Sequence, residues 1–372
     1  MATGERLETL LATAGCEADG PSRDVTPPLH LSTTFERGPD GDYPGGYVYS
    51  REGNPTRALL ERTLAKAEGG EACAAFASGM AACNALITAV CPGGHLLVPH
   101  DVYHGLRHVI ETTWREWGLR VTAVDYSGDW EEAIQPDTRL VWIETPSNPL
   151  VQITDIEAVS VAARARGIPT AVDSTWNTPL ITQPLALGAT YVIHSATKYL
   201  GGHSDLLGGA VVGSGTAVES VYHVQKHGGA VMDPFSAWLV LRGMRSLPAR
   251  LRVQCASAEA IARFLDAHAM VQRVHYPSLE SHAGHAVAQR QMQMWGGMLS
   301  FEIDGGRSAA LALTGKFRHF RRATSLGGTE SLVEHRASVE PEPPTSPEGL
   351  LRISVGLEHV DDLLEDLGQA LS

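Results

Sequence analysis

The chain has 372 residues, of which 43% are hydrophobic and 19% are charged, and it contains 38 glycines and 21 prolines. This composition is typical of a globular protein and excludes a chain that is largely disordered. The formal net charge is −13 and no basic stripe is present, so a nucleic-acid partner is disfavoured.

No apolar run approaches the length that spans a bilayer, and residues 1–20 lack the apolar segment of a secretory signal. The five cysteines are odd in number, lack Cys-x-x-Cys spacing and stand at Cys16, Cys73, Cys83, Cys91 and Cys255. We therefore expect reduced thiols in a cytoplasmic protein, without a membrane partner, a disulfide framework or a metal site.

The first segment, residues 1–50, has no helical or strand periodicity. It contains Pro27-Pro28 and a glycine-rich stretch from Gly38 to Gly46. We expect an extended arm, which needs a partner surface to become ordered.

Residues 51–245 alternate between short apolar runs and helical periodicity. The expected strands are 71–78, 95–100, 120–125, 138–144, 168–173 and 189–194, and the expected helices are 79–90, 103–117 and 156–167. This alternation predicts a large α/β domain whose mostly parallel sheet is covered by helices on both faces.

The pattern of predicted helices and strands changes in residues 246–372, and it indicates a smaller α+β domain. The expected helices are 246–270, 307–314 and 360–371, the expected strands are 297–303 and 350–355, and 340–348 is a Pro/Glu-rich loop.

Polar residues end several of the predicted strands of the large domain. They are Ser78, residues 144–148, Asp173 and residues 195–198. In a parallel α/β sheet, ligands bind beyond the carboxyl ends of the strands, so we expect these residues around one crevice.

The most informative of these segments is residues 194–205, His-Ser-Ala-Thr-Lys-Tyr-Leu-Gly-Gly-His-Ser-Asp. Lys198 follows a buried strand, where an ammonium is costly unless it is paired or serves as a nucleophile. Ser195 and Thr197 are placed to hold a phosphate beside it. A lysine for a Schiff base next to a phosphate cradle indicates pyridoxal 5'-phosphate (PLP). The alternative is a surface lysine beside a chance glycine pair.

Two more segments suit the same cofactor. Asp173 at a strand end would keep a pyridine nitrogen protonated, and Thr175 would orient it or touch the ring. Ser78-Gly79-Met80 stands where a strand turns into a helix, and free amides at a helix start bind phosphate. The alternative for both Asp173 and Ser78 is an ordinary helix N-cap.

Ordered motifs extend along the whole chain, at residues 49–56, 77–82, 144–149, 173–175, 194–205, 325–328, 330–332 and 351–356. With them the chain resembles the Cys/Met-metabolism family of PLP enzymes, which includes cystathionine γ-synthase, cystathionine γ-lyase and methionine γ-lyase. The resemblance implies PLP fold type I, like aspartate aminotransferase, and a homotetramer built from catalytic dimers.

The resemblance also implies roles for individual residues. Lys198 would carry the cofactor and then shuttle protons. Tyr103 would stack on the cofactor ring and relay a proton, its alternative being a core aromatic. Tyr49 and Arg51 would reach the phosphate of a neighbouring subunit.

At the substrate end, Arg352 suits a bidentate clamp on an α-carboxylate, assisted by Asn148 and Ser325. The alternative for Arg352 is a structural salt bridge. His282 and His285 have a spacing that suggests a metal pair, but their segment resembles one that the family carries without metal, so we interpret them as structural.

The chain departs from the family pattern at positions that bear on substrate choice. Val48 and Thr324 stand where synthases and lyases commonly have acidic residues, and a site without countercharge disfavours a distal ammonium. Gly105 replaces the cysteine of methionine γ-lyases, and His104 is either an extra acid/base or a helix-start residue. His335-Arg336-Ala337 replaces the usual His-Pro-Ala.

We therefore expect a PLP-dependent lyase that eliminates the γ-substituent of an L-amino acid and yields a 2-oxo acid and ammonia. The alternatives are γ-replacement on an O-acylhomoserine and a specialised γ-lyase with a non-sulfur leaving group. A cofactor-free scaffold is a further alternative, against which the intact Lys198 argues.

Overall fold

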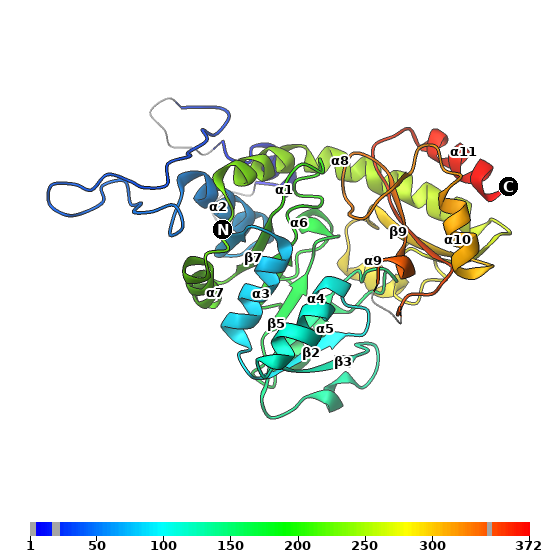
Figure 1. Ribbon diagram of the computed structural model, residues 1–372, viewed down its shortest axis with the longest axis horizontal. Coiled ribbons are helices and arrows are strands. Elements are labelled where there is room, and N and C mark those ends of the chain that lie inside the picture. The colour runs from blue at the N-terminus through cyan, green and yellow to red at the C-terminus, as the bar shows by residue number, and fades with distance from the viewer. Residues whose placement is uncertain (1–4, 17–22, 341–343) are drawn as a thin grey trace.

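The computed structural model describes residues 5–16, 23–340 and 344–372. Within these residues, the strands form a seven-stranded and a five-stranded sheet, and the long helix α8 (Pro234–Asp266) runs from one to the other (Figure 1). The expected α/β fold with a second, smaller α+β part is confirmed. None of the helices in this part of the chain is both long enough and apolar enough to cross a membrane.

The large sheet has the order β1-β7-β6-β5-β4-β2-β3. Its strands are β1 (Ala72–Phe76), β2 (His95–Pro99), β3 (Arg120–Val124), β4 (Thr138–Glu144), β5 (Thr170–Asp173), β6 (Tyr191–His194) and β7 (Gly209–Gly213). Strands β2 to β6 pair in parallel, whereas β7 is antiparallel to both β1 and β6. The sheet is mostly parallel, as expected, but β7 was not anticipated because its few apolar residues lie between glycines.

Helices pack on both faces of this sheet. They are α2 (Pro55–Glu68), α3 (Gly79–Val90), α4 (His104–Val109), α5 (Ile156–Arg164), α6 (Thr178–Ile181) and α7 (Gly215–Gly228), with α1 (Leu7–Ala12) packed near α8. An apolar core lies on each face of the sheet, and β4 contributes to both because successive side chains of a strand point to opposite faces. Leu140 and Trp142 join the core under α3 and α7, whereas Val141 and Ile143 join the core under α5.

The segment expected as one helix over 103–117 is helical without a break from residue 104 to 116. Its geometry changes along the way, because the π-helical segment Ile110–Trp114 follows α4. A short 3₁₀ turn at Trp130–Ala133 precedes β4.

Helix α8 begins twelve residues before the expected residue 246. Asp233 caps it by accepting hydrogen bonds from the backbone amides of Phe235 and Ser236, and Pro234 occupies the first helical position. Asp-Pro is a strong helix start. Pro248 lies inside the helix, so the change of sequence pattern near residue 246 does not mark a helix boundary. The domain boundary placed between residues 245 and 246, which falls within α8, stays a prediction.

The smaller sheet has the order β10-β11-β12-β9-β8. Its strands are β8 (Val271–His275), β9 (Met298–Ile303), β10 (Arg321–Arg322), β11 (Leu332–His335) and β12 (Leu350–Ser354), and its helices are α9 (His285–Gln291), α10 (Gly306–Thr314) and α11 (Val360–Leu371). A separate apolar core that includes Phe301 and Leu351 holds this sheet against α8, α10 and α11. Residues 341–343 of the expected Pro/Glu-rich loop lie outside the described residues.

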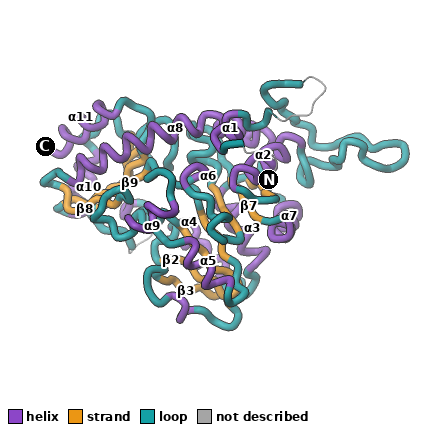
Figure 2. The backbone as a smooth tube through the Cα atoms, turned by 180° about the vertical axis from the view of Figure 1, so that it is seen from behind, coloured by secondary structure: helices purple, strands orange, loops and turns teal. Residues whose placement is uncertain are grey.

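The expectation of an extended arm over residues 1–50 is wrong for residues 5–16, because they contain helix α1, which buries Leu11 and packs on α8. Residues 23–50 have no helix and no strand longer than the isolated bridge between Thr34 and Tyr49. This part of the arm extends away from the body of the molecule (Figure 2). Val25 and Leu31 on it are 76% and 66% exposed, which leaves apolar surface without cover in the single chain.

Candidate functional site

A cavity of ≈ 220 Å³ lies beyond the carboxyl ends of the parallel strands. Ten residues named from the sequence line it: Ser78, Gly79, Met80, Tyr103, Asn148, Asp173, Thr175, Ser195, Thr197 and Lys198. The topology of the sheet places them there, because β4, β5 and β6 are parallel neighbours whose last residues meet at one edge.

Lys198 lies in the turn after β6 and is largely enclosed. Its Nζ donates a hydrogen bond to Ser325 Oγ at 3.0 Å. Burial lowers the pKa of Lys198, and the charge of Arg352 lowers it further, whereas Glu334 raises it. The lysine therefore loses its proton more readily than an exposed lysine, as a nucleophilic amine requires.

The start of α3 faces Ser195. Ser78 caps α3, with its Oγ accepting a hydrogen bond from the Ala81 amide at 3.1 Å, so the N-cap interpretation of Ser78 also holds. A Cβ on Gly79 would stand 2.8 Å from Ser195 Cβ, so only glycine leaves this space open. The start of α3 therefore lies directly against Ser195, and both line the cavity, where the free amides of a helix start can bind an anion.

Asp173 ends β5, and its Oδ1 accepts a hydrogen bond from the Thr175 amide at 3.0 Å. Burial raises the pKa of Asp173, while the hydrogen bonds from Thr175 and the charge of His194 lower it. Among the residues that the structure describes, Asp173 has no ion pair. Thr175 Oγ1 accepts from the Ser195 amide at 2.8 Å, which joins the ends of β5 and β6.

Tyr103 immediately precedes α4, and its backbone amide donates to Glu144 Oε2 at 2.8 Å. Burial raises the pKa of the Tyr103 hydroxyl, and the charge of Arg336 opposes this. The ring of His104 lies edge-on to that of Tyr103, with 4.8 Å between ring centroids. Burial lowers the pKa of His104, and Arg336 lowers it further.

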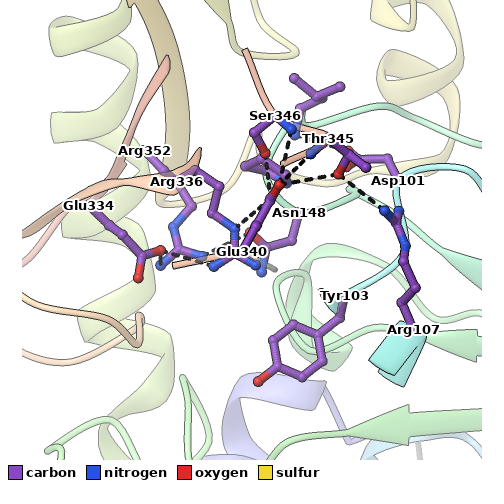
Figure 3. Close-up of polar contacts among 12 residues, drawn as sticks. Asp101, Tyr103, Arg107, Asn148, Glu334, Arg336, Glu340, Thr345, Ser346 and Arg352 are labelled. Carbon is purple, nitrogen blue, oxygen red and sulfur yellow. Dashed lines mark hydrogen bonds and ion pairs between the residues drawn. The ribbon is translucent and has the colours of Figure 1, made fainter. Parts of the chain in front are cut away.

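Arg352 lies on β12 and reaches toward the large domain (Figure 3). Its Nη1 donates to Asn148 Oδ1 at 2.8 Å and its Nη2 donates to the Ser325 carbonyl at 3.1 Å. Its Nη2 also pairs with Glu334 Oε2 at 2.7 Å. Arg352 therefore forms both the salt bridge of the alternative interpretation, with Glu334, and the contacts predicted with Asn148 and Ser325.

The remaining predicted residues lie apart from the cavity. Val48, Tyr49 and Arg51 are on the arm and do not line it; Arg51 Nη1 donates to the Lys226 carbonyl at 2.8 Å. The Arg51 guanidinium lies 5.6 Å from the centre of the Tyr49 ring. Thr324 is exposed and lines an adjoining opening with Ser325.

Seven residues that line the cavity were given no role from the sequence: Cys83, Glu144, Pro146, Trp176, Ile193, Leu207 and Leu326. Glu144 could have been assigned to the site from the sequence, because it ends a predicted strand. Burial raises the pKa of Glu144 well above its usual range, and the charge of Asp173 adds to this. His282 and His285 each contact a backbone carbonyl, of Val151 and Pro277 respectively.

These donors fit PLP. An aldehyde would meet the amine of Lys198, and a phosphate would meet the first turn of α3. A pyridine nitrogen would meet the carboxylate of Asp173, which forms no ion pair within the described part of the chain. The space that a Cβ on Gly79 would fill belongs to that phosphate cradle.

The comparisons with known proteins agree with this fit. The family model "Cys/Met metabolism PLP-dependent enzyme" matches residues 8–372. A cystathionine γ-synthase of Mycobacterium tuberculosis is 43% identical over 370 residues, which covers 96% of this chain and 95% of the relative. A cystathionine γ-lyase of Bacillus subtilis is 41% identical over 377 residues, covering 98% and 99%. A crystal structure of cystathionine γ-synthase from Xanthomonas oryzae pv. oryzae in complex with cystathionine is 41% identical, with a TM-score of 0.95 and coverage of 99% and 98%.

Proposed function

The chain belongs to the Cys/Met-metabolism family of PLP-dependent enzymes, and we propose that it eliminates the γ-substituent of an L-amino acid to give a 2-oxo acid and ammonia. The observation that carries this is the position of the Lys198 amine. Lys198 lines the same cavity as Asp173, and its amine donates to Ser325, whose carbonyl accepts from the Arg352 guanidinium.

PLP, when bound at Lys198, supplies an electron sink that makes the substrate's α proton acidic. Asp173 would hold the ring nitrogen in its protonated form, and the Thr175 amide fixes the Asp173 carboxylate. The residues that would hold the phosphate are Ser78, Gly79, Met80, Ser195 and Thr197.

Lys198 Nζ removes the proton at Cα and then moves protons to and from the neighbouring carbon. Ser325 orients this amine through its hydroxyl. Tyr103, which lines the cavity, would pack against the cofactor ring, and its hydroxyl would deliver a proton to the departing γ-group. Arg352 and Asn148 fix the substrate's α-carboxylate, which sets the direction of the side chain.

The substrate's distal end is uncharged in this proposal. Val48 and Thr324 are the positions at which an acidic side chain would balance a distal ammonium, and both are uncharged. An ammonium enclosed without a countercharge is costly. The preferred leaving group therefore ends in a neutral moiety.

A second candidate function is γ-replacement on an O-acylhomoserine by a thiol. What favours it is the 41–43% identity to proteins named cystathionine γ-synthase. The same groups serve both reactions up to the loss of the γ-substituent, after which a thiol rather than water determines the product.

The active enzyme is proposed to be a homo-oligomer, a tetramer built from catalytic dimers. The exposed arm supports this, since Tyr49 and Arg51 do not line their own chain's cavity and would complete a neighbour's phosphate site in this proposal. The free cysteines of the described residues support a reducing, cytoplasmic setting.

The test is a coupled assay of 2-oxo acid and of released leaving group over methionine, homocysteine, cystathionine, cysteine and O-acylhomoserines, each with and without added thiol. We expect 2-oxo acid without thiol, at the highest kcat/KM for a substrate with an uncharged distal end. Product formation only when thiol is present would overturn elimination in favour of replacement.

A further inference from the structure

A second guanidinium lies buried behind the substrate end of the site. Arg336 follows β11, where the usual family pattern has proline, and is 3% exposed (Figure 3). A buried guanidinium must be compensated by hydrogen bonds and countercharge, so its partners indicate what it does.

The first partner of Arg336 is shared with Arg352. Glu334 and Arg352 lie opposite each other on the paired strands β11 and β12. Glu334 Oε2 accepts from Arg352 Nη2 at 2.7 Å and from Arg336 Nη1 at 3.2 Å. The other oxygen of Glu334, Oε1, is buried without a partner within the described part of the chain. A single carboxylate oxygen therefore holds both guanidinium groups.

The second partner of Arg336 is the carboxylate of Glu340, at 3.4 Å from Arg336 Nε. Glu340 in turn accepts hydrogen bonds from the backbone amides of Thr345 and Ser346, at 2.9 and 3.0 Å. Arg107 on α4 donates to Thr345 Oγ1 at 3.1 Å. This chain of contacts runs from the small sheet to the helix that begins beside Tyr103.

The shared oxygen of Glu334 has a consequence for substrate binding. An incoming α-carboxylate that binds Nη2 of Arg352 competes with Glu334 for it, whereas Nε of Arg352 has no hydrogen-bond partner among the described residues. A carboxylate oxygen divided between two guanidinium groups binds each less strongly than it would bind one alone. We propose that Arg336 is a positioning residue for the substrate's α-carboxylate, because by sharing Glu334 it weakens the hold of Glu334 on Arg352.

The proposal rests on the role of Arg352 in the proposed function, but not on which γ-substituent the enzyme removes. The electrostatics agree with it: the pKa of Arg352 is lowered to about 10, mainly by burial, and Glu334 raises this pKa whereas Arg336 lowers it. The alternative is that Arg336 only compensates Glu340 and stabilises the loop.

The experiment is a titration of the holoenzyme with L-norvaline, which has the α-amine and α-carboxylate but no leaving group, followed by the absorbance of the bound cofactor. n-Butylamine, which is norvaline without its carboxylate, is the matched ligand. For Arg336→Met we expect norvaline affinity to fall on the order of tenfold, the size of a charged hydrogen bond, with butylamine unchanged.

Three further variants separate the proposal from a loop effect. Arg336→Met/Glu340→Gln removes the buried charge that the single variant leaves unpaired, and should bind norvaline as weakly as Arg336→Met. Arg336→Met/Glu334→Gln removes the competitor and should recover the wild-type affinity. Glu340→Gln alone releases Arg336 toward Glu334 and should bind norvaline equally or more tightly.

Wild-type norvaline affinity in Arg336→Met/Glu340→Gln, or no recovery in Arg336→Met/Glu334→Gln, overturns the proposal and leaves the proposed function standing. A wild-type enzyme that binds norvaline no better than butylamine overturns the role of Arg352 itself. Melting temperatures of all variants identify any variant that is unfolded. If Arg336→Met is unfolded, the two double variants decide the outcome.

Discussion

Lys198 and Ser325, 127 residues apart in the sequence, meet through a 3.0 Å hydrogen bond from Nζ to Oγ. Ser325 adopts a left-handed backbone with φ of 83°, which few non-glycine residues do. Its carbonyl accepts from Arg352 Nη2. One residue thus ties the nucleophilic amine of the large domain to the guanidinium of the small one, and strain at such a position is typical of functional sites.

The attachment site of PLP can be tested chemically. Borohydride reduction of the holoenzyme followed by peptide mapping should place the label on Lys198, because its amine lines the cavity and has a lowered pKa. Lys198→Ala should keep its melting temperature in the apo form and lose both the label and activity. A label on any other lysine contradicts the assignment.

Gly79→Ala tests the phosphate cradle. The added Cβ would stand 2.8 Å from Ser195 Cβ, so the serine must shift. We expect the affinity for PLP to fall about tenfold, the effect of losing one charged hydrogen bond, while the affinity for pyridoxal, which lacks the phosphate, changes little. Gly228→Ala is the matched control, since its Cβ would meet only Val224 Cγ1 at 4.0 Å. Equal losses for both ligands would argue against the cradle.

The arm is tested by complementation. Arg51→Ala and Lys198→Ala subunits should each be inactive alone and regain part of the activity in mixed oligomers, because one site then receives an intact arm and an intact lysine. Mass spectrometry verifies the mixing. Verified mixed oligomers without recovered activity would show that the arm serves its own chain.

The rate of PLP attachment to the apoenzyme should depend on pH through Lys198. Only the neutral amine attacks the aldehyde, so the rate rises as pH passes the pKa of Lys198, which burial and the charge of Arg352 lower. Arg352→Gln removes one lowering cause, and the rise should move to higher pH. Arg263→Gln, an exposed position on α8, serves as control and should leave the profile in place. An unmoved profile in Arg352→Gln contradicts the electrostatic coupling.

Substrate selectivity should respond to the two uncharged positions. A countercharge recovers about 1.5–3 kcal/mol through a charged hydrogen bond, so Thr324→Glu, alone or with Val48→Asp, should raise the relative kcat/KM for cystathionine roughly tenfold or more. Thr324→Gln is the isosteric control and should change this ratio little. If the unmodified enzyme already prefers cystathionine, the argument from these positions fails.

Local features of the fold could be predicted because their signals lie within a few residues of each other. Helix α3 was predicted with the bounds that it has, since Ser78 caps it and a run of small and apolar residues follows. Strand β4 was likewise predicted over Thr138–Glu144 from its apolar run. Strand β11 was missed because the buried Glu334 and His335 break the apolar pattern of a strand.

The sequence by itself determined the chemistry of the large domain, because parallel strands bring the residues that follow them to one edge of the sheet. Lys198, Asp173 and Ser78 could be placed together on that rule alone. Only the tertiary structure decided the substrate end. Arg352 and Arg336 share one carboxylate oxygen of Glu334 through the pairing of β11 with β12, and Arg352 also contacts Asn148 of the large domain. No local periodicity encodes these contacts, because packing between separate segments selects them.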